Sequence, residues 1–329
     1  MATGSYSGGG EANSLTAIKT QIAGLADNIY KAEAKTSMLS APPALIRGFQ
    51  NAKTGQIPSL SMQGLGDYSE VNGYPNGAIT LAWADYTLAY DRARKFNVDV
   101  VDMMTEAGQL EMGYVMGEFM RQQAVPEMDA LTLASIAQRT ISNQGSITSH
   151  VGHHIIYSYT PAVATFLTKI IDQLTACQVD SNKEDGFTIF VNSAYRSILE
   201  GSTEYTKTRD IAAGVARLDG RISSINGQAV VYVPNALMYA KYDTYDGYTD
   251  GETAGGFTPA ASGGFSVAAQ IVHNDAAMTV VAHQVTKIIT PEQNQGADAY
   301  SIAFRSYFDT IVPNNKRDGC AAIIVSAES

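Results

Sequence analysis

Residues 66–102 read GDYSEVNGYPNGAITLAWADYTLAYDRARKFNVDVVD, and residues 118–131 continue the same region with EFMRQQAVPEMDAL. In the first stretch, apolar side chains occupy every second position at Ile79, Leu81 and Trp83, which is the spacing of a β-strand. Two Asn-Gly pairs, at 72–73 and 76–77, supply residues that tolerate the positive φ angles of a tight reversal. The sequence therefore predicts an extended β-hairpin followed by a helix.

Such a hairpin is a poor element for a monomer. A two-stranded ribbon that stands away from a domain exposes its edges and buries little apolar surface, so it is marginally stable until something covers it. We expect a second copy of the chain to provide that cover. The expected contacts on and near the hairpin are Leu60, Met62, Tyr74, Ile79, Leu81, Trp83, Tyr86 and Arg92.

Composition sets broad limits on the protein. The 329 residues suffice for one large or two modest domains, and the 45% hydrophobic content allows a substantial core. A formal net charge of −10 argues against a general nucleic-acid binder, which needs clustered Lys and Arg. The N-terminal sequence lacks the pattern of a secretory signal, and no apolar run is long enough to span a bilayer, so we expect synthesis in the cytoplasm and no membrane partner.

The N-terminal region is expected to form an arm. Residues 1–13 are rich in Gly and Ser, and an amphipathic helix is predicted from Ser14 to about Lys35 before Pro42-Pro43 prevent its extension. The residues of its apolar stripe expected to contact other subunits are Ile18, Ile22 and Leu25. The alternative is a helix folded back on its own domain.

The middle of the chain mixes helices and strands. Apolar spacing predicts a helix between Asp99 and Gln123, with its face formed by Val100, Met104, Ala107, Leu110, Val115 and Phe119. Pro126 breaks the hydrogen-bond ladder of that helix but can begin a new helical segment. A helix capped by Thr160 and opened by Pro161 is also predicted, with Cys177 on its buried stripe.

Shorter signals complete this region. The predicted elements are a buried strand from Phe187, a short helix stopped by Gly201 and a hairpin turning at Asn226-Gly227. Residues 240–264 have no helical or strand periodicity, and we expect an exposed loop. Near the C-terminus Tyr300, Ile302 and Phe304 alternate, and the segment CAAIIVS, residues 320–326, is expected to return as their partner strand.

The order of these features resembles the major capsid proteins of tailed bacteriophages, with the HK-97-like capsid fold. The sequence features that carry the resemblance are Gly73-Tyr74, Trp83, Tyr86-Thr87-Leu88, Asp91-Arg92, Phe96, Val98, Asp99, Glu118-Phe119-Met120-Arg121, Val125-Pro126-Glu127-Met128-Asp129-Ala130 and the closing segment 271–319. Each motif is loose by itself, and the strength of the resemblance lies in their order over most of the chain.

The resemblance implies an α+β fold in five parts. They are an N-terminal arm (1–56), an E-loop hairpin (57–95), the spine helix of the peripheral domain (96–142), an axial domain (143–290) and the C-terminal strands of the peripheral domain (291–329).

The implied function is that of a structural subunit of the virion. Copies would assemble into hexamers and pentamers of an icosahedral head around double-stranded DNA, without sequence-specific binding. A separate scaffolding protein, a portal and possible decoration proteins would be partners. Some members of the family join subunits through an E-loop lysine, but no lysine occurs here between Thr54 and Arg94, so we expect no such cross-link. An encapsulin-type protein cage is the close alternative.

No motif for chemistry stands out. The chain lacks a phosphate-binding loop and a nucleophile elbow. His150, His153 and His154 are the best metal candidates and support a distant alternative, a metal-dependent hydrolase, but their spacing misses the helical i, i+4 pair. The acidic residues of the 240–264 loop do not match a calcium-binding loop. We expect no enzyme activity, no catalytic residues, no metal and no cofactor.

Overall fold

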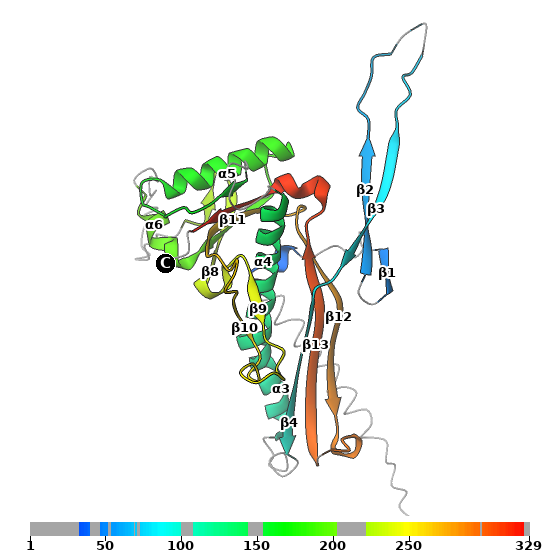
Figure 1. Ribbon diagram of the computed structural model, residues 1–329, viewed down its shortest axis with the longest axis vertical. Helices are drawn as coiled ribbons and strands as arrows, with labels where there is room; N and C mark the ends of the chain where they lie inside the picture. Colours follow the sequence, from blue (N-terminus) through cyan, green and yellow to red (C-terminus); the bar gives the residue numbers. More distant parts are fainter. Residues whose placement is uncertain are drawn as a thin grey trace, which may run out of the picture.

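The computed structural model describes residues 33–39, 47–51, 54–68, 70, 73–99, 108–143, 154–202, 222–296 and 298–325. Figure 1 shows a ribbon that projects from the body, a long helix beside a narrow sheet, and a broader sheet beneath a second helix. The predicted α+β class is confirmed. The predicted N-terminal helix, with Ile18, Ile22 and Leu25, lies outside the described residues.

The projecting ribbon is the predicted hairpin. Strand β2 (Thr54–Met62) pairs antiparallel with β3 (Ile79–Thr87), and the short β1 (Arg47–Asn51) pairs with β2. Of the two expected reversal points, Gly73 has a positive φ of 72° but Gly77 does not. The residues after the hairpin differ from the prediction, because β4 (Tyr90–Asp99) leaves the ribbon and joins another sheet. The expected hairpin boundary at residue 95 therefore cuts through β4.

The long helix carries a π-helical turn. Helix α3 (Gly108–Phe119) runs through the π segment Met120–Ala124 into α4 (Val125–Asn143). The Val125 N–H donates to the carbonyl of Met120, five residues back. Pro126 lacks an N–H and its ring crowds the preceding turn, which accounts for the irregularity at this point. The predicted interruption of the hydrogen-bond ladder at Pro126 thus takes the form of a bulge within one continuous helix.

The buried face of α3 differs from the predicted one. Met116 and Met120 are fully buried, whereas Val115 is exposed. These methionines lie four residues apart, so they occupy one face and pack with Ile302 and Phe304 of the neighbouring sheet. The predicted residues Val100, Met104 and Ala107 lie outside the described residues, as does the side chain of Leu110.

The narrow sheet has the order β12-β13-β4, from β12 (Met278–Ile289), β13 (Ala299–Ile311) and β4. All its pairings are antiparallel. One face packs against the helix through Phe119, whose ring centroid lies 4.9 Å from that of Phe96 and 6.1 Å from that of Phe304. The predicted alternation around Phe304 is confirmed. Strand β12, expected in the axial domain, belongs instead to this sheet.

The broader sheet has the order β5-β14-β11-β6-β8-β7. Its strands are β5 (Ile155–Ile156), β6 (Phe187–Asn192), β7 (Ser224–Ile225), β8 (Gln228–Val233), β11 (Val267–His273) and β14 (Cys320–Ile324). The predicted turn at Asn226-Gly227 is confirmed, since both residues have positive φ.

Strand β14 corrects the expectation that residues 320–326 pair with the Tyr300 strand. It pairs with β11 and, in parallel, with β5. Ala322 and Ile324 pack in the core beneath α4, whereas Ala321 and Ile323 pack in the core beneath helix α5 (Phe166–Ser181). A strand buried on both faces needs a layer of structure on each side, and the broader sheet provides both at β14, through α4 and α5.

Two further predictions change. Helix α5 begins at Phe166 rather than at Pro161, because Thr165 still has a non-helical backbone. Most of its predicted stripe, including Cys177, is buried, but Ile171 is half-buried and Val163, which precedes the helix, is exposed. Helix α6 (Arg196–Glu200) ends at Gly201 as predicted.

Residues 240–264 contain a small hairpin of β9 (Tyr242–Thr244) and β10 (Phe257–Pro259) instead of a loop alone. The buried Tyr242 hydroxyl anchors this hairpin by donating to the carbonyl of Ala236 at 2.8 Å.

Candidate assembly surfaces

The ribbon exposes an apolar face. Residues two apart on one strand share a face, so Ile79, Leu81 and Trp83 point to the same side, where Met62 and Leu60 stand opposite Ile79 and Leu81. Ile79 and Leu81 are 71% and 56% exposed, and Met62 and Trp83 are exposed as well. The side chain of Leu60 lies outside the described set. Covering such a face is worth about 1.5–3 kcal/mol for each large side chain.

The tip of the ribbon adds aromatic surface. Tyr74 is 86% exposed, and its ring centroid lies 5.1 Å from that of Tyr68 in an edge-to-face arrangement. Leu65 is completely exposed between two glycines. Sequence reasoning missed Leu65 and Tyr68, because they lie between the predicted strands and follow no periodicity. Their signal is apolar side chains in a short Gly-rich segment.

Two of the predicted contact residues are engaged within their own subunit. Tyr86 is partly buried against a cluster that contains Leu88 and Tyr307, and burial raises the pKa of its hydroxyl. Arg92 forms an ion pair with Glu127 of α4 and donates to the carbonyls of Tyr245 at 2.8 Å and Gly256 at 3.0 Å. Arg92 therefore ties β4 to the helix and to the β9–β10 hairpin at the base of the ribbon.

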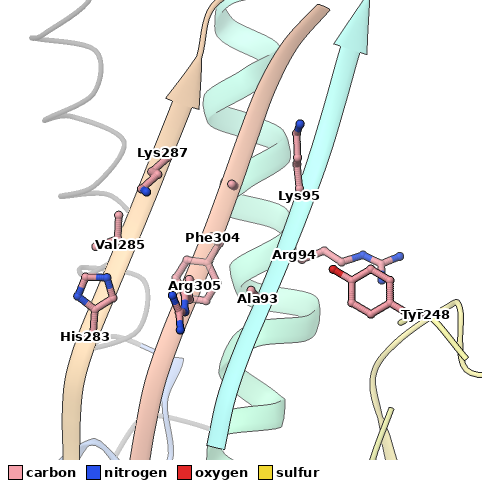
Figure 2. A pocket seen from close by; sticks show the side chains of 10 residues that line it. Ala93, Arg94, Lys95, Tyr248, His283, Val285, Lys287, Phe304 and Arg305 are labelled. Atoms are coloured by element: carbon pink, nitrogen blue, oxygen red, sulfur yellow. The ribbon is translucent and has the colours of Figure 1, made fainter. Parts of the chain in front are cut away.

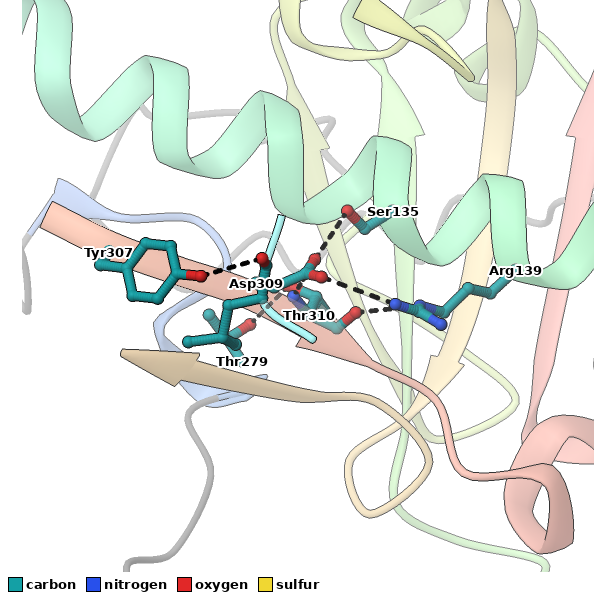
Figure 3. Close-up of polar contacts among 7 residues, drawn as sticks. Ser135, Arg139, Thr279, Tyr307, Asp309 and Thr310 are labelled. Carbon is teal, nitrogen blue, oxygen red and sulfur yellow. Dashed lines mark hydrogen bonds and ion pairs between the residues drawn. The ribbon is translucent and has the colours of Figure 1, made fainter. Parts of the chain in front are cut away.

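A buried polar cluster lies where the ribbon leaves the body (Figure 3). The Tyr307 hydroxyl donates to the carbonyl of Leu88 at 3.0 Å, which fixes the residue after β3. Asp309 accepts hydrogen bonds from the Thr310 N–H at 2.7 Å and from the Ser135 hydroxyl at 3.4 Å.

The same cluster joins the long helix to the narrow sheet. Arg139 Nη2 lies 3.6 Å from Asp309 Oδ2, and Arg139 Nε donates to the carbonyl of Thr310 at 3.1 Å. Burial raises the pKa of Asp309, although these donors and Arg139 partly offset it. The cluster holds α4, β13 and the base of the ribbon in one arrangement.

The N-terminal segment is pinned to the long helix. Glu33 forms an ion pair with Arg121 at 2.8 Å. The backbone N–H groups of Lys35 and Thr36 donate to the carboxylate of Asp129, and Leu39 is buried in the core beneath α4. The segment therefore reaches the body of its own subunit at the π-helical turn.

Of the three histidines that could have formed a metal site, His154 packs inside the protein. His154 is buried, with Nε2 2.9 Å from Asp180 Oδ2 and Nδ1 3.3 Å from Cys177 Sγ. His150 and His153 lie outside the described residues. Within the described ranges, no group of three or more His, Cys, Asp or Glu side chains could hold a metal ion.

The acidic loop is likewise organised by its own hydrogen bonds. The hydroxyl and N–H of Thr249 and the N–H of Tyr248 donate to Asp246, which lowers the pKa of that carboxyl to about 2. Over the described parts of the chain, no helix is both long enough and apolar enough to cross a membrane.

No family model matches the sequence, and no curated protein matches it. Solved structures do match. The capsid structure of the cyanophage P-SCSP1u superposes with a TM-score of 0.57 at 15% identity, covering 85% of this chain and 85% of that one. The mature capsid of bacteriophage PhiM1 gives 0.55 at 14%, covering 84% and 83%, and a chain of Gordonia phage Cozz gives 0.52 at 16%, covering 91% and 87%. This chain has the HK-97-like capsid fold.

The elements take the names that this fold gives them. The ribbon of β2 and β3 is the E-loop, and α3, the π turn and α4 together form the spine helix. The narrow sheet β12-β13-β4 lies beside the spine helix in the peripheral domain. The broader sheet, covered by α5 on its far face, is the axial domain.

Proposed function

We propose that this protein is a major capsid protein, a structural subunit that assembles into the icosahedral head enclosing phage double-stranded DNA. The observation that carries the proposal is the apolar E-loop face around Ile79 and Leu81, which finds no burial among the described residues of its own subunit. The capsid fold supports the same reading. The role is structural rather than enzymatic.

In the assembly, each E-loop would lie over a neighbouring subunit and the N-terminal arm would contact another. The same heterologous contact, repeated around closed rings, gives hexamers and pentamers, and curvature closes them into a shell. The Leu60, Met62 and Trp83 positions share the apolar face with Ile79, so they are proposed contacts too. A scaffolding protein, a portal and decoration proteins are proposed as further partners.

The test is assembly of the full-length chain, measured by light scattering after size-exclusion chromatography and by electron microscopy. Wild-type protein is expected to form closed shells. Replacing Ile79→Ser and Leu81→Ser together removes apolar surface from the ribbon and should prevent assembly, with circular dichroism unchanged because both side chains are exposed. The matched control, Val163→Ser with Val179→Ser, alters exposed valines of the axial domain and should still form shells.

Two results would contradict the proposal. One is a wild-type chain that stays monomeric at high concentration. The other is an Ile79→Ser/Leu81→Ser variant that assembles as well as the control. If shells form, the contents of particles isolated from the native source separate a phage head from an encapsulin-type cage, because the head holds nuclease-protected DNA and the cage holds a protein cargo.

A further inference from the structure

The face of the peripheral sheet that the spine helix does not cover carries a basic groove of about 270 Å³ (Figure 2). Strand register places Lys95, Ala303 and Lys287 in one row across β4, β13 and β12. The next row places Arg305 at its centre. Lys95, Lys287 and Arg305 line the groove on this face, and Arg94 lines it from the edge of β4 beside Tyr248; no carboxylate is among the described residues that line it.

The charges of this groove are only partly matched. Arg305 is held by both oxygens of Asp91, at 2.9 and 2.6 Å. Lys95 and Lys287 are exposed, and no hydrogen bond or ion pair joins either of them to another described residue. Two cations without a partner among the described residues therefore lie on either side of β13, on a chain whose net charge is −10.

The shape of the groove favours an extended polyanion over an apolar ligand. Between the cations, the face offers the small side chains Ala93, Ala303 and Val285, which give no deep pocket for an anchor residue. Adjacent strands lie about 4.8 Å apart, so Lys95 and Lys287 are rooted roughly 10 Å from each other. Their flexible stems can follow a charged backbone without reading its sequence.

We propose that this groove contacts the phosphate backbone of double-stranded DNA. The inference rests on the proposed function, since a head subunit surrounds DNA, and it identifies where on the subunit that contact is made. Two or three phosphate contacts give weak, salt-sensitive binding, because affinity comes from releasing the counterions of those phosphates. A face that holds DNA so loosely lets the strand slide past it.

The experiment measures binding of the full-length chain to a fluorescent 20-base-pair duplex by anisotropy over a series of salt concentrations. In Lys95→Gln/Lys287→Gln, the slope of log affinity against log salt should fall in magnitude by about 2, which is about 1 for each lost phosphate contact. The control Lys169→Gln/Lys183→Gln removes the same charge from exposed lysines of the axial domain and should keep the wild-type slope.

Equal slopes for the two double variants would overturn the proposal, because binding would then follow net charge and not this groove. Polyglutamate serves as the second probe. If it binds more tightly than DNA and loses that affinity in Lys95→Gln/Lys287→Gln, the groove takes an acidic protein segment and the DNA proposal is wrong. Electron microscopy of the same variants keeps the two questions apart, since shells that form without DNA contact at the groove leave the capsid function intact.

Discussion

The hydroxyl of Thr36 donates to Oδ1 of Asp129 across 2.6 Å, joining the N-terminal segment to the spine helix. Both side chains are almost completely buried, and the same carboxylate accepts from the backbone N–H groups of Lys35 and Thr36. Asp129 lies three residues after Pro126, so the contact fixes the N-terminal segment beside the π-helical turn. A buried carboxylate needs such donors, because desolvation without them is costly.

Thr36→Val is expected to destabilise the subunit by about 2 kcal/mol. The change keeps the shape of the side chain but removes one of three donors to a buried charge, and a hydrogen bond to a charged group is worth about 1.5–3 kcal/mol. Urea unfolding of the unassembled chain measures this. Thr175→Val, whose exposed hydroxyl donates to the helix carbonyl of Ile171, is the control and should change stability little. Equal effects from the two would remove the special role of Thr36.

Arg92→Ala is expected to cost about 2–4 kcal/mol. It leaves the largely buried Glu127 without its ion-pair partner and deprives the carbonyls of Tyr245 and Gly256 of a donor. Arg305→Ala is the matched control on the neighbouring strand, because its pair with Asp91 is exposed and should matter little to folding. Thermal unfolding of both variants checks the difference, and a larger loss for Arg305→Ala would contradict it.

Local chemistry made part of the fold predictable. The alternation at Ile79, Leu81 and Trp83 and the Asn226-Gly227 turn each depend on a few neighbouring residues, and both appear as predicted. The sheet that β14 joins could not be predicted from neighbouring residues. The apolar residues of this strand fit any buried strand, and only the layers around it, formed by α4 and α5, select the broader sheet.

The candidate assembly surfaces also combine predictable and unpredictable features. Exposed apolar residues at alternate positions of the E-loop follow from strand periodicity. The inward roles of Tyr86 and Arg92 depend on Tyr307, Glu127 and Tyr245, which lie far away in the sequence. The basic groove likewise forms only when β4, β12 and β13 pair in register. Its lining therefore cannot be predicted from any single segment of the sequence.

Asp309→Asn is expected to flatten the dependence of stability on pH above about pH 4. Burial raises the folded-state pKa of Asp309, so between its unfolded and folded pKa values the folded state binds more protons than the unfolded state. The contribution of Asp309 to stability is therefore full below the unfolded pKa and is lost as pH rises through the folded pKa. Tyr90, Ser135 and Arg139 face this carboxyl and are unchanged in the variant.

Urea midpoints of wild type and Asp309→Asn between pH 3.5 and 7.5 measure this effect. The difference between the two proteins should shift steadily in favour of the variant as pH rises. A difference in stability that is independent of pH, or that shifts toward wild type, would show that folding does not raise the pKa of Asp309.

The two thiols are expected to be unreactive in the folded subunit. Burial raises the pKa of Cys320 to about 12 and carries the pKa of Cys177 well above its usual range, so almost no thiolate forms at pH 8. A chromogenic disulfide reagent should report no fast thiol in the native protein and two in urea. One fast thiol in the native state would mean that α5 or β14 opens locally.

Mature particles are expected to give a single band of about 35.1 kDa on a denaturing gel. The covalent cross-link expected from the sequence resemblance in some capsid proteins begins at a lysine on the E-loop, and this ribbon carries no lysine between Thr54 and Arg94. Without that amine, subunits are joined only by apolar burial, hydrogen bonds and ion pairs, all of which detergent disrupts. Bands at multiples of the subunit mass would contradict this. Introducing Gln63→Lys near the ribbon tip tests whether the missing amine is the sole obstacle, since a ladder would then appear only in the variant.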